Sequence, residues 1–202
     1  MSRTEITRDD VMPLAAYEAV RAERRRAMAA VKRNRRVEVG PFATFYFECF
    51  ATMLHQVQEM LFIEKGGDEQ LADELAAYNP LVPKGDELVA TVMFEIDDKI
   101  RRENVLARLG GIENHMLLTV GGERIACLPE EDVDRTSAAG KASAVQFVHF
   151  KFTPAQIAAF RRAGAQVVLG FDHPDYGHMA VVPEAVRAEL AGDFAAEPAS
   201  AA

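Results

Sequence analysis

The sequence predicts a single α+β domain with a mixed or mainly antiparallel sheet and helices packed mostly on one face. The chain has 202 residues, about the length of one domain. Segments with the period of strands are interleaved with segments of helical spacing, and no repeat period is present. Two strand-like segments flank a Gly-Gly pair, which favours a tight hairpin and therefore antiparallel pairing.

The N-terminal part is predicted to be mainly helical. Residues from Thr7 to about Asn34 follow a helical spacing that is broken near Pro13. Five aromatic rings between Phe42 and Phe50 then indicate a buried strand. A helix follows, because apolar residues recur on one face at i, i+3, i+4, i+7 and i+11: Phe50, Met53, Leu54, Val57 and Leu61. Gly66-Gly67 ends this helix, and a shorter helix precedes Asn79-Pro80.

The second half of the chain supplies most of the predicted sheet. Gly121-Gly122 forms the hairpin turn, and Thr153-Pro154-Ala155-Gln156 reads as a capping box that opens a helix. Residues 129–142 are small and polar, so we expect a loop. The domain is predicted to span 1–191, with the Ala-rich residues 192–202 as a disordered tail. The expected strands are 88–96, 116–120, 123–128, 144–152 and 166–171.

Composition excludes several classes of protein. Apolar residues make up 49% of the chain, but no apolar run is long enough for a membrane span, and the N-terminus lacks a signal-peptide pattern. Two cysteines form no disulfide framework, so a cytoplasmic location is expected. The net charge is −8, although residues 21–36 carry eight bases and one acid, so binding to nucleic acid is not expected. Gly-rich nucleotide loops, HExxH and GxSxG motifs are absent.

The first candidate site lies on the helix that begins near Phe50. His55 and Glu59 are four residues apart, and therefore lie on one side of the helix, opposite its apolar face. Glu48 joins the same column if the helix extends backward. An imidazole–carboxylate pair at this spacing can bind a divalent metal or act as a general base with an orienting acid. The alternative is an ordinary polar helix face.

The second candidate site follows the strand predicted at 166–171. Asp172, His173 and His178 lie within seven residues, and these residue types suit acid–base catalysis or ligation of Fe, Mn or Zn. If they met His55 and Glu59 in one pocket, the set could be catalytic or metal-binding. The alternative is a turn, because Asp, Pro and Gly are turn residues.

The third candidate is the basic segment 32–36. Arg33, Arg35 and Arg36 could hold an anionic ligand or dock an acidic surface, because guanidinium groups bind carboxylates and phosphates bidentately. The alternative is a solvated helix end with bases that complement the helix dipole.

The chain also resembles a bacterial family, the domain of unknown function numbered 3501. The resemblance covers about residues 5–192 and is carried by five segments: 32–36, 56–60, 78–81, 143–147 and 172–176. The family brings no established activity. Its members tend to be encoded beside rubrerythrin-like and iron–sulfur-binding proteins, which implies a redox or metal-linked context.

Two functions are therefore expected from different classes. The first is an accessory metal-binding protein or enzyme of a cytoplasmic redox or oxidative-stress system, which uses the His/Glu/Asp set. The second is a non-catalytic partner or scaffold that docks a rubrerythrin-like or iron–sulfur protein, or an anionic ligand, through residues 32–36. The oligomeric state is left open.

Overall fold

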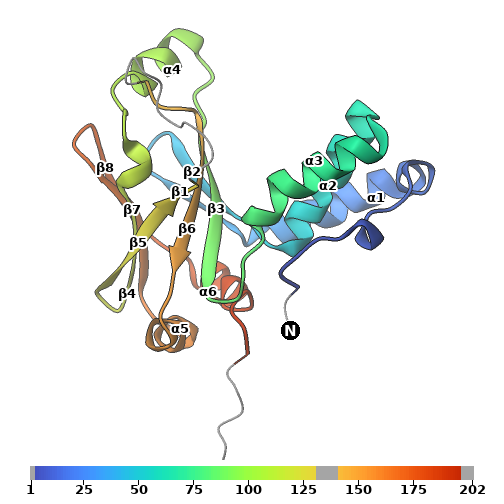
Figure 1. Cartoon of the computed structure of the whole chain (residues 1–202). Coiled ribbons are helices and arrows are strands. Elements are labelled where there is room, and N and C mark those ends of the chain that lie inside the picture. Colours follow the sequence, from blue (N-terminus) through green and yellow to red (C-terminus); the bar gives the residue numbers. More distant parts are fainter. Residues whose placement is uncertain (1–2, 131–140, 197–202) are drawn as a thin grey trace, which may run out of the picture.

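The described residues, 3–130 and 141–196 of a computed structural model, form an antiparallel sheet with helices on both of its faces (Figure 1). The strands are β1 Arg36–Val39, β2 Ala43–Phe47, β3 Glu87–Phe94, β4 Met116–Val120, β5 Glu123–Pro129, β6 Val145–Lys151, β7 Val167–His173 and β8 Tyr176–Val181. The helices are α1 Leu14–Arg33, α2 Phe50–Glu64, α3 Gly67–Tyr78, α4 Lys99–Leu106, α5 Pro154–Arg161 and α6 Glu184–Leu190, with short 3₁₀ turns η1 Arg8–Asp10, η2 Asn79–Leu81 and η3 Ile112–Asn114.

The sheet has the strand order β1-β2-β3-β6-β5-β4-β7-β8, and every neighbouring pair is antiparallel. Strand β5 belongs to both halves, because its first residues pair with β4 and Cys127–Pro129 pair with β6. The sheet curls so far that Phe45 of β2 meets Phe171 of β7, with ring centroids 5.2 Å apart. The predicted α+β class and the antiparallel sheet are therefore confirmed.

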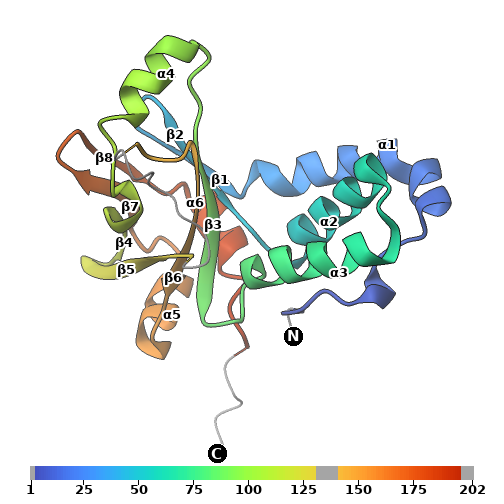
Figure 2. The same cartoon turned by 45° about the horizontal axis from the view of Figure 1, so that its top comes forward.

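Alternation along the strands creates two separate hydrophobic clusters. The inward residues of β3, such as Leu88 and Val92, join the main core, which α4, α5 and α6 also contact. The outward residue Val89 packs instead with Met53 and Val57 of α2 and with part of α3. The helices are thus divided between the two faces, whereas the sequence analysis expected them mostly on one. Figures 1 and 2 show α1, α2 and α3 extending away from the sheet as one group.

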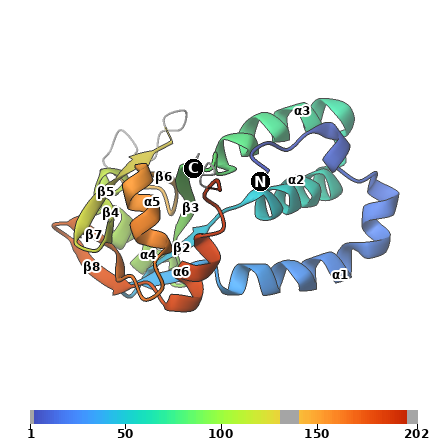
Figure 3. The ribbon, with the colours of Figure 1, turned by 90° about the horizontal axis from the view of Figure 1, so that it is seen from below.

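Helix α1 is the least buried long element. Of its 20 residues only Tyr17 is buried, and the helix packs mainly along α2 (Figure 3). No helix in the described ranges is long and apolar enough to cross a membrane.

The first and last strands meet at Tyr176 of β8. The Tyr176 hydroxyl accepts hydrogen bonds from the backbone N–H groups of Phe42 and Ala43, both at 3.0 Å, and donates one to the carbonyl of Val39 at 2.9 Å. Gly40 has a φ of 69° in the turn beside it, and a Cβ there would lie 2.8 Å from this hydroxyl. The turn between β1 and β2 therefore requires glycine for both its conformation and its space.

The C-terminal boundary predicted from the sequence is wrong for residues 192–196. Phe194 is buried against Phe152, with ring centroids 4.8 Å apart, and Ala195 donates a backbone hydrogen bond to Gly85. These contacts order the segment because they bury a large ring and satisfy a backbone donor. The predicted loop falls largely on 131–140, and the end of the tail on 197–202, both outside the described residues.

Candidate functional site

The structure does not bring the two predicted polar groups together. His55 and Glu59 lie on α2, in the helical group on one side of the sheet, whereas Asp172–His178 spans the β7–β8 hairpin on the other side in Figures 1, 2 and 3. Within residues 3–130 and 141–196, no cluster of three or more His, Cys, Asp and Glu side chains could hold a metal ion. The composite metal or catalytic site is therefore wrong, because the hairpin does not cover α2.

The Asp172–His178 segment is a tight hairpin turn, as the alternative interpretation held. His173 is buried, and its two ring nitrogens contact backbone groups: Nδ1 accepts from the N–H of Asp175 at 3.1 Å, and Nε2 lies 3.3 Å from the carbonyl oxygen of Gly110. Asp172 pairs with His115 at 3.0 Å and with Arg124 at 2.8 Å. His178 packs against the ring of Tyr176. These side chains are engaged in holding the turn.

His55 and Glu59 belong to a cluster that joins α1 to α2. Arg21 binds the Glu59 carboxylate with two hydrogen bonds, of 2.9 and 2.7 Å, and the hydroxyl of Tyr17 donates to it at 2.6 Å. The same hydroxyl lies 3.5 Å from Nδ1 of His55. The guanidinium of Arg21 also stacks 4.5 Å from the ring centroid of Phe62. Sequence reasoning identified the pair correctly as neighbours, but missed that α1 supplies their partners.

The histidine and the glutamate of this cluster both have a lowered pKa, but for different reasons. The hydrogen bonds from Arg21 lower the pKa of Glu59 to about 2, helped by the Tyr17 hydroxyl against the effect of burial. Burial lowers the pKa of His55; Glu59 opposes this, while Lys32 and Arg25 add to it. Glu59 is thus fully engaged as a carboxylate, which suits a structural contact between the helices better than a metal ligand.

Arg35 does not belong to an exposed anion-binding segment, which corrects the prediction for the basic residues. Its side chain is 3% exposed, and it donates to the carbonyls of Phe47 and Glu48 at 3.0 Å each. It also forms a close ion pair with Asp193. The neighbouring Arg33 and Arg36 are exposed, and Arg36 pairs with Glu38 at 2.8 Å. Of the three arginines, a docking role would rest on Arg33 and Arg36.

Glu48 has a different environment from the one expected of a metal ligand. It is 6% exposed, and each carboxylate oxygen accepts a hydrogen bond from a threonine hydroxyl, Thr52 at 2.6 Å and Thr91 at 2.7 Å. None of the ion pairs formed among the described residues includes Glu48. A buried charge is normally paired, so this carboxylate lacks the counter-charge that its burial calls for.

Glu48 lines a pocket of ≈ 230 Å³ between the outer face of the sheet and the ends of the three N-terminal helices; we refer to it as the Glu48 pocket. Three aromatic side chains line it, Tyr46, Tyr78 and Phe147, together with the methionines Met53 and Met93. Its other polar residues are Lys32, Gln56 and Thr91.

Sequence reasoning missed this pocket, although the resemblance contained a signal for it. Four of the five segments that carry the resemblance contribute lining residues: 32–36, 56–60, 78–81 and 143–147. These segments come from different elements and meet only in the folded chain. Their convergence makes the Glu48 pocket the best-supported candidate functional site.

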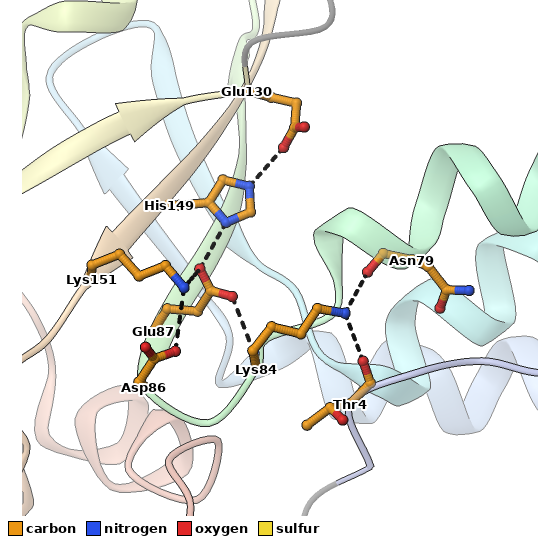
Figure 4. A network of polar contacts seen from close by, with 8 residues as sticks. All are labelled: Thr4, Asn79, Lys84, Asp86, Glu87, Glu130, His149 and Lys151. Atoms are coloured by element: carbon orange, nitrogen blue, oxygen red, sulfur yellow. Dashed lines mark hydrogen bonds and ion pairs between the residues drawn. The ribbon is translucent and has the colours of Figure 1, made fainter.

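A second polar network lies farther along the same outer face, around His149 (Figure 4). The ring nitrogens of His149 contact Glu87 at 2.9 Å and Glu130 at 2.8 Å, and Lys151 pairs with Glu87 at 2.9 Å. Lys84 extends the network to the N-terminal segment through the carbonyl of Thr4. Burial lowers the pKa of His149, but the hydrogen bonds to the two carboxylates outweigh it and leave the pKa raised. His149 is thus a satisfied sheet histidine, as the sequence analysis expected.

This network predicts a pH dependence of stability. Because the pKa of His149 is raised above 6.5 in the folded state, its contribution is fully present below pH 6.5 and is lost as the pH rises through the folded value. We expect His149→Gln to lower the free energy of unfolding by about 1 kcal/mol near pH 6 and by less at about pH 9. Denaturant unfolding at several pH values in this range measures the difference in the free energy of unfolding between wild type and variant. Lys99→Gln, which alters an exposed lysine outside this network, is the control; a constant difference across the range would refute the prediction.

Comparison with known proteins places the chain in a family. The family model described as "Protein of unknown function (DUF3501)" matches residues 5–194. A crystal structure of a novel protein of unknown function from Burkholderia pseudomallei K96243 is 39% identical, covers 94% of this chain and 99% of its own, and superposes with a TM-score of 0.87. No curated protein matches.

Proposed function

The chain belongs to the DUF3501 family, and within this family we propose that it is a binding protein for a small organic cation, which it holds in the Glu48 pocket. The observation that carries the proposal is the buried Glu48 carboxylate, which has two hydroxyl donors and no basic partner among the described residues. A protonated amine in the pocket would supply the missing charge. The role in a redox system implied by the resemblance stays a prediction beside it.

The hydrogen bonds around Glu48 support an anionic anchor. Thr52 and Thr91 donate to different oxygens, which holds the carboxylate in one orientation. Carboxylates accept several hydrogen bonds, so each oxygen keeps capacity for a donor from a ligand. A charge-assisted hydrogen bond to an ammonium group would be stronger than the neutral bonds already present.

The walls of the pocket support the same class of ligand. Aromatic faces attract cations through their quadrupole, and Tyr46, Tyr78 and Phe147 all line the pocket. Its volume of ≈ 230 Å³ is below the roughly 300–1,000 Å³ of pockets that hold drug-sized ligands. A fragment-sized amine with an apolar body therefore fits the pocket better than a large metabolite.

Three molecules of similar shape and different charge test the proposal: benzylamine, benzyl alcohol and benzoate. We expect benzylamine to bind with a dissociation constant on the order of 1 mM, as ligand efficiencies for about eight heavy atoms suggest. Benzyl alcohol should bind about tenfold more weakly because it lacks the charge. Titrations followed by NMR chemical shifts of the Glu48, Thr91 and Phe147 amides would both measure and locate the binding.

Two substitutions sharpen the test. Glu48→Gln keeps the shape of the side chain but removes its charge, and should weaken benzylamine binding about tenfold while leaving benzyl alcohol unaffected. Glu64→Gln is the control, because it removes the same charge from an exposed residue of α2 outside the pocket lining. Equal binding of the amine and the alcohol would overturn the proposal.

A further inference from the structure

A second pocket lies on the opposite side of α2, where α1 passes along it; we refer to it as the α1–α2 pocket. Its volume is ≈ 200 Å³. Most of its lining is apolar and comes from both helices, including Met28 and Val31 of α1 and Phe50 and Leu54 of α2. The polar lining residues include Arg24 and His55.

The acidic groups near this pocket are already neutralised. Asp10, which lines it, pairs with Arg3 at 2.5 Å and also accepts hydrogen bonds from Thr7. Glu59 is held by Arg21 and Tyr17 through both of its oxygens. These acids therefore offer no free negative charge to a ligand.

The basic groups are not neutralised in the same way. Arg24 lines the pocket, and none of the ion pairs within the described ranges uses Arg24, Arg25 or Lys32. Arg25 and Lys32 lie close enough to His55 to reinforce the lowering of its pKa that burial begins. The pocket is thus an apolar cavity whose polar lining includes one guanidinium, that of Arg24, outside these ion pairs.

We infer that the α1–α2 pocket binds a small organic anion, a molecule with an apolar body and a single carboxylate. The apolar body would lie against Met28, Val31 and Leu54, and the carboxylate would meet Arg24 and His55 at the polar side. Guanidinium groups suit this role because they bind carboxylates with two parallel hydrogen bonds. The site is distinct from the Glu48 pocket and takes a ligand of opposite charge.

The benzyl series separates this inference from the proposed function. Benzoate should shift NMR signals of α1 and α2 residues around Met28 and His55, and should bind about tenfold more tightly than benzyl alcohol there. Raising the salt concentration should weaken benzoate binding and leave benzyl alcohol unchanged. Benzylamine should shift the Glu48 pocket instead, so each proposal can fail without the other.

Arg24→Gln is the decisive variant, because Arg24 is exposed and its loss should leave the fold intact. We expect it to reduce benzoate binding to the level of benzyl alcohol. Arg26→Gln is the control: it removes the same charge from the same helix, but at a residue outside the pocket lining. If both variants weaken benzoate equally, or if benzoate binds no better than benzyl alcohol, the inference is overturned.

Discussion

Replacing Arg35 by glutamine is expected to lower the free energy of unfolding by about 3–5 kcal/mol, because it breaks a buried ion pair from one side. The guanidinium of Arg35 joins three parts of the chain. It donates to the carbonyls of Phe47 and Glu48 at the end of β2, and it pairs with Asp193 beyond α6. Without it, the Asp193 carboxylate loses its buried counter-charge, and the carbonyls of Phe47 and Glu48 each lose a hydrogen-bond donor.

Denaturant unfolding of the two proteins measures this loss. Arg33→Gln and Arg36→Gln are matched controls from the same basic segment, and as exposed residues they should change stability by less than about 0.5 kcal/mol. The comparison tests whether Arg35 stabilises the fold while the exposed Arg33 and Arg36 do not. A small effect at Arg35 would show that the C-terminal segment is held mainly by the packing of Phe194.

Replacing Glu59 by glutamine is expected to cost about 2–3 kcal/mol at neutral pH, because Arg21 and Tyr17 would lose a charged acceptor. The pKa of Glu59 is lowered from 4.5 to about 2 in the folded protein. Its contribution is therefore fully present above pH 4.5 and is lost as the pH falls through 2. The difference between wild type and variant should shrink over this interval.

Unfolding measured from acid to neutral pH tests whether the contribution of Glu59 to stability decreases toward acid pH. Glu64→Gln is the control, because Glu64 is exposed on the same helix. A difference for Glu59→Gln that persists undiminished near pH 2 would contradict the assignment of the charge to the Arg21 pair. In that case the hydrogen bond from Tyr17 would account for the contribution.

Elements with local causes were predictable from the sequence. Gly121 and Gly122 have φ values of 58° and 88°, as a hairpin turn of this kind requires. The hydroxyl of Thr153 accepts from the N–H of Gln156, which confirms the predicted cap. The strand predicted over 88–96 is β3, displaced by one or two residues at its ends. Such features depend on a few neighbouring residues, so periodicity and turn chemistry reveal them.

Features with distant causes were not predictable. Phe194 stands in an Ala-rich stretch with the composition of a disordered tail, and contacts with distant parts of the chain, including Phe152 and Phe160, order it. Asp172 and His173 have the composition of a metal site, but the same residue types build a tight turn. Composition alone does not separate the two uses.

The Glu48 pocket, like these features, could not be predicted from local sequence. Sequence reasoning predicted the strand over 88–96, but most of the outer side of this strand, including Thr91, is buried as well as its inner side. It had no means of showing that the ends of α1, α2 and α3 close over that side. The segments of the family resemblance were known, but their meeting point follows only from tertiary packing.

The hydroxyl of Tyr176 has a consequence for how the protein behaves among other copies of itself. Strands β1 and β8 are the two ends of the sheet, and sheet ends expose backbone groups on which a foreign strand can assemble. Here one phenol occupies backbone groups at the β1–β2 turn while β8 itself lies alongside. Each end of the sheet thereby shields part of the other from pairing with a foreign strand.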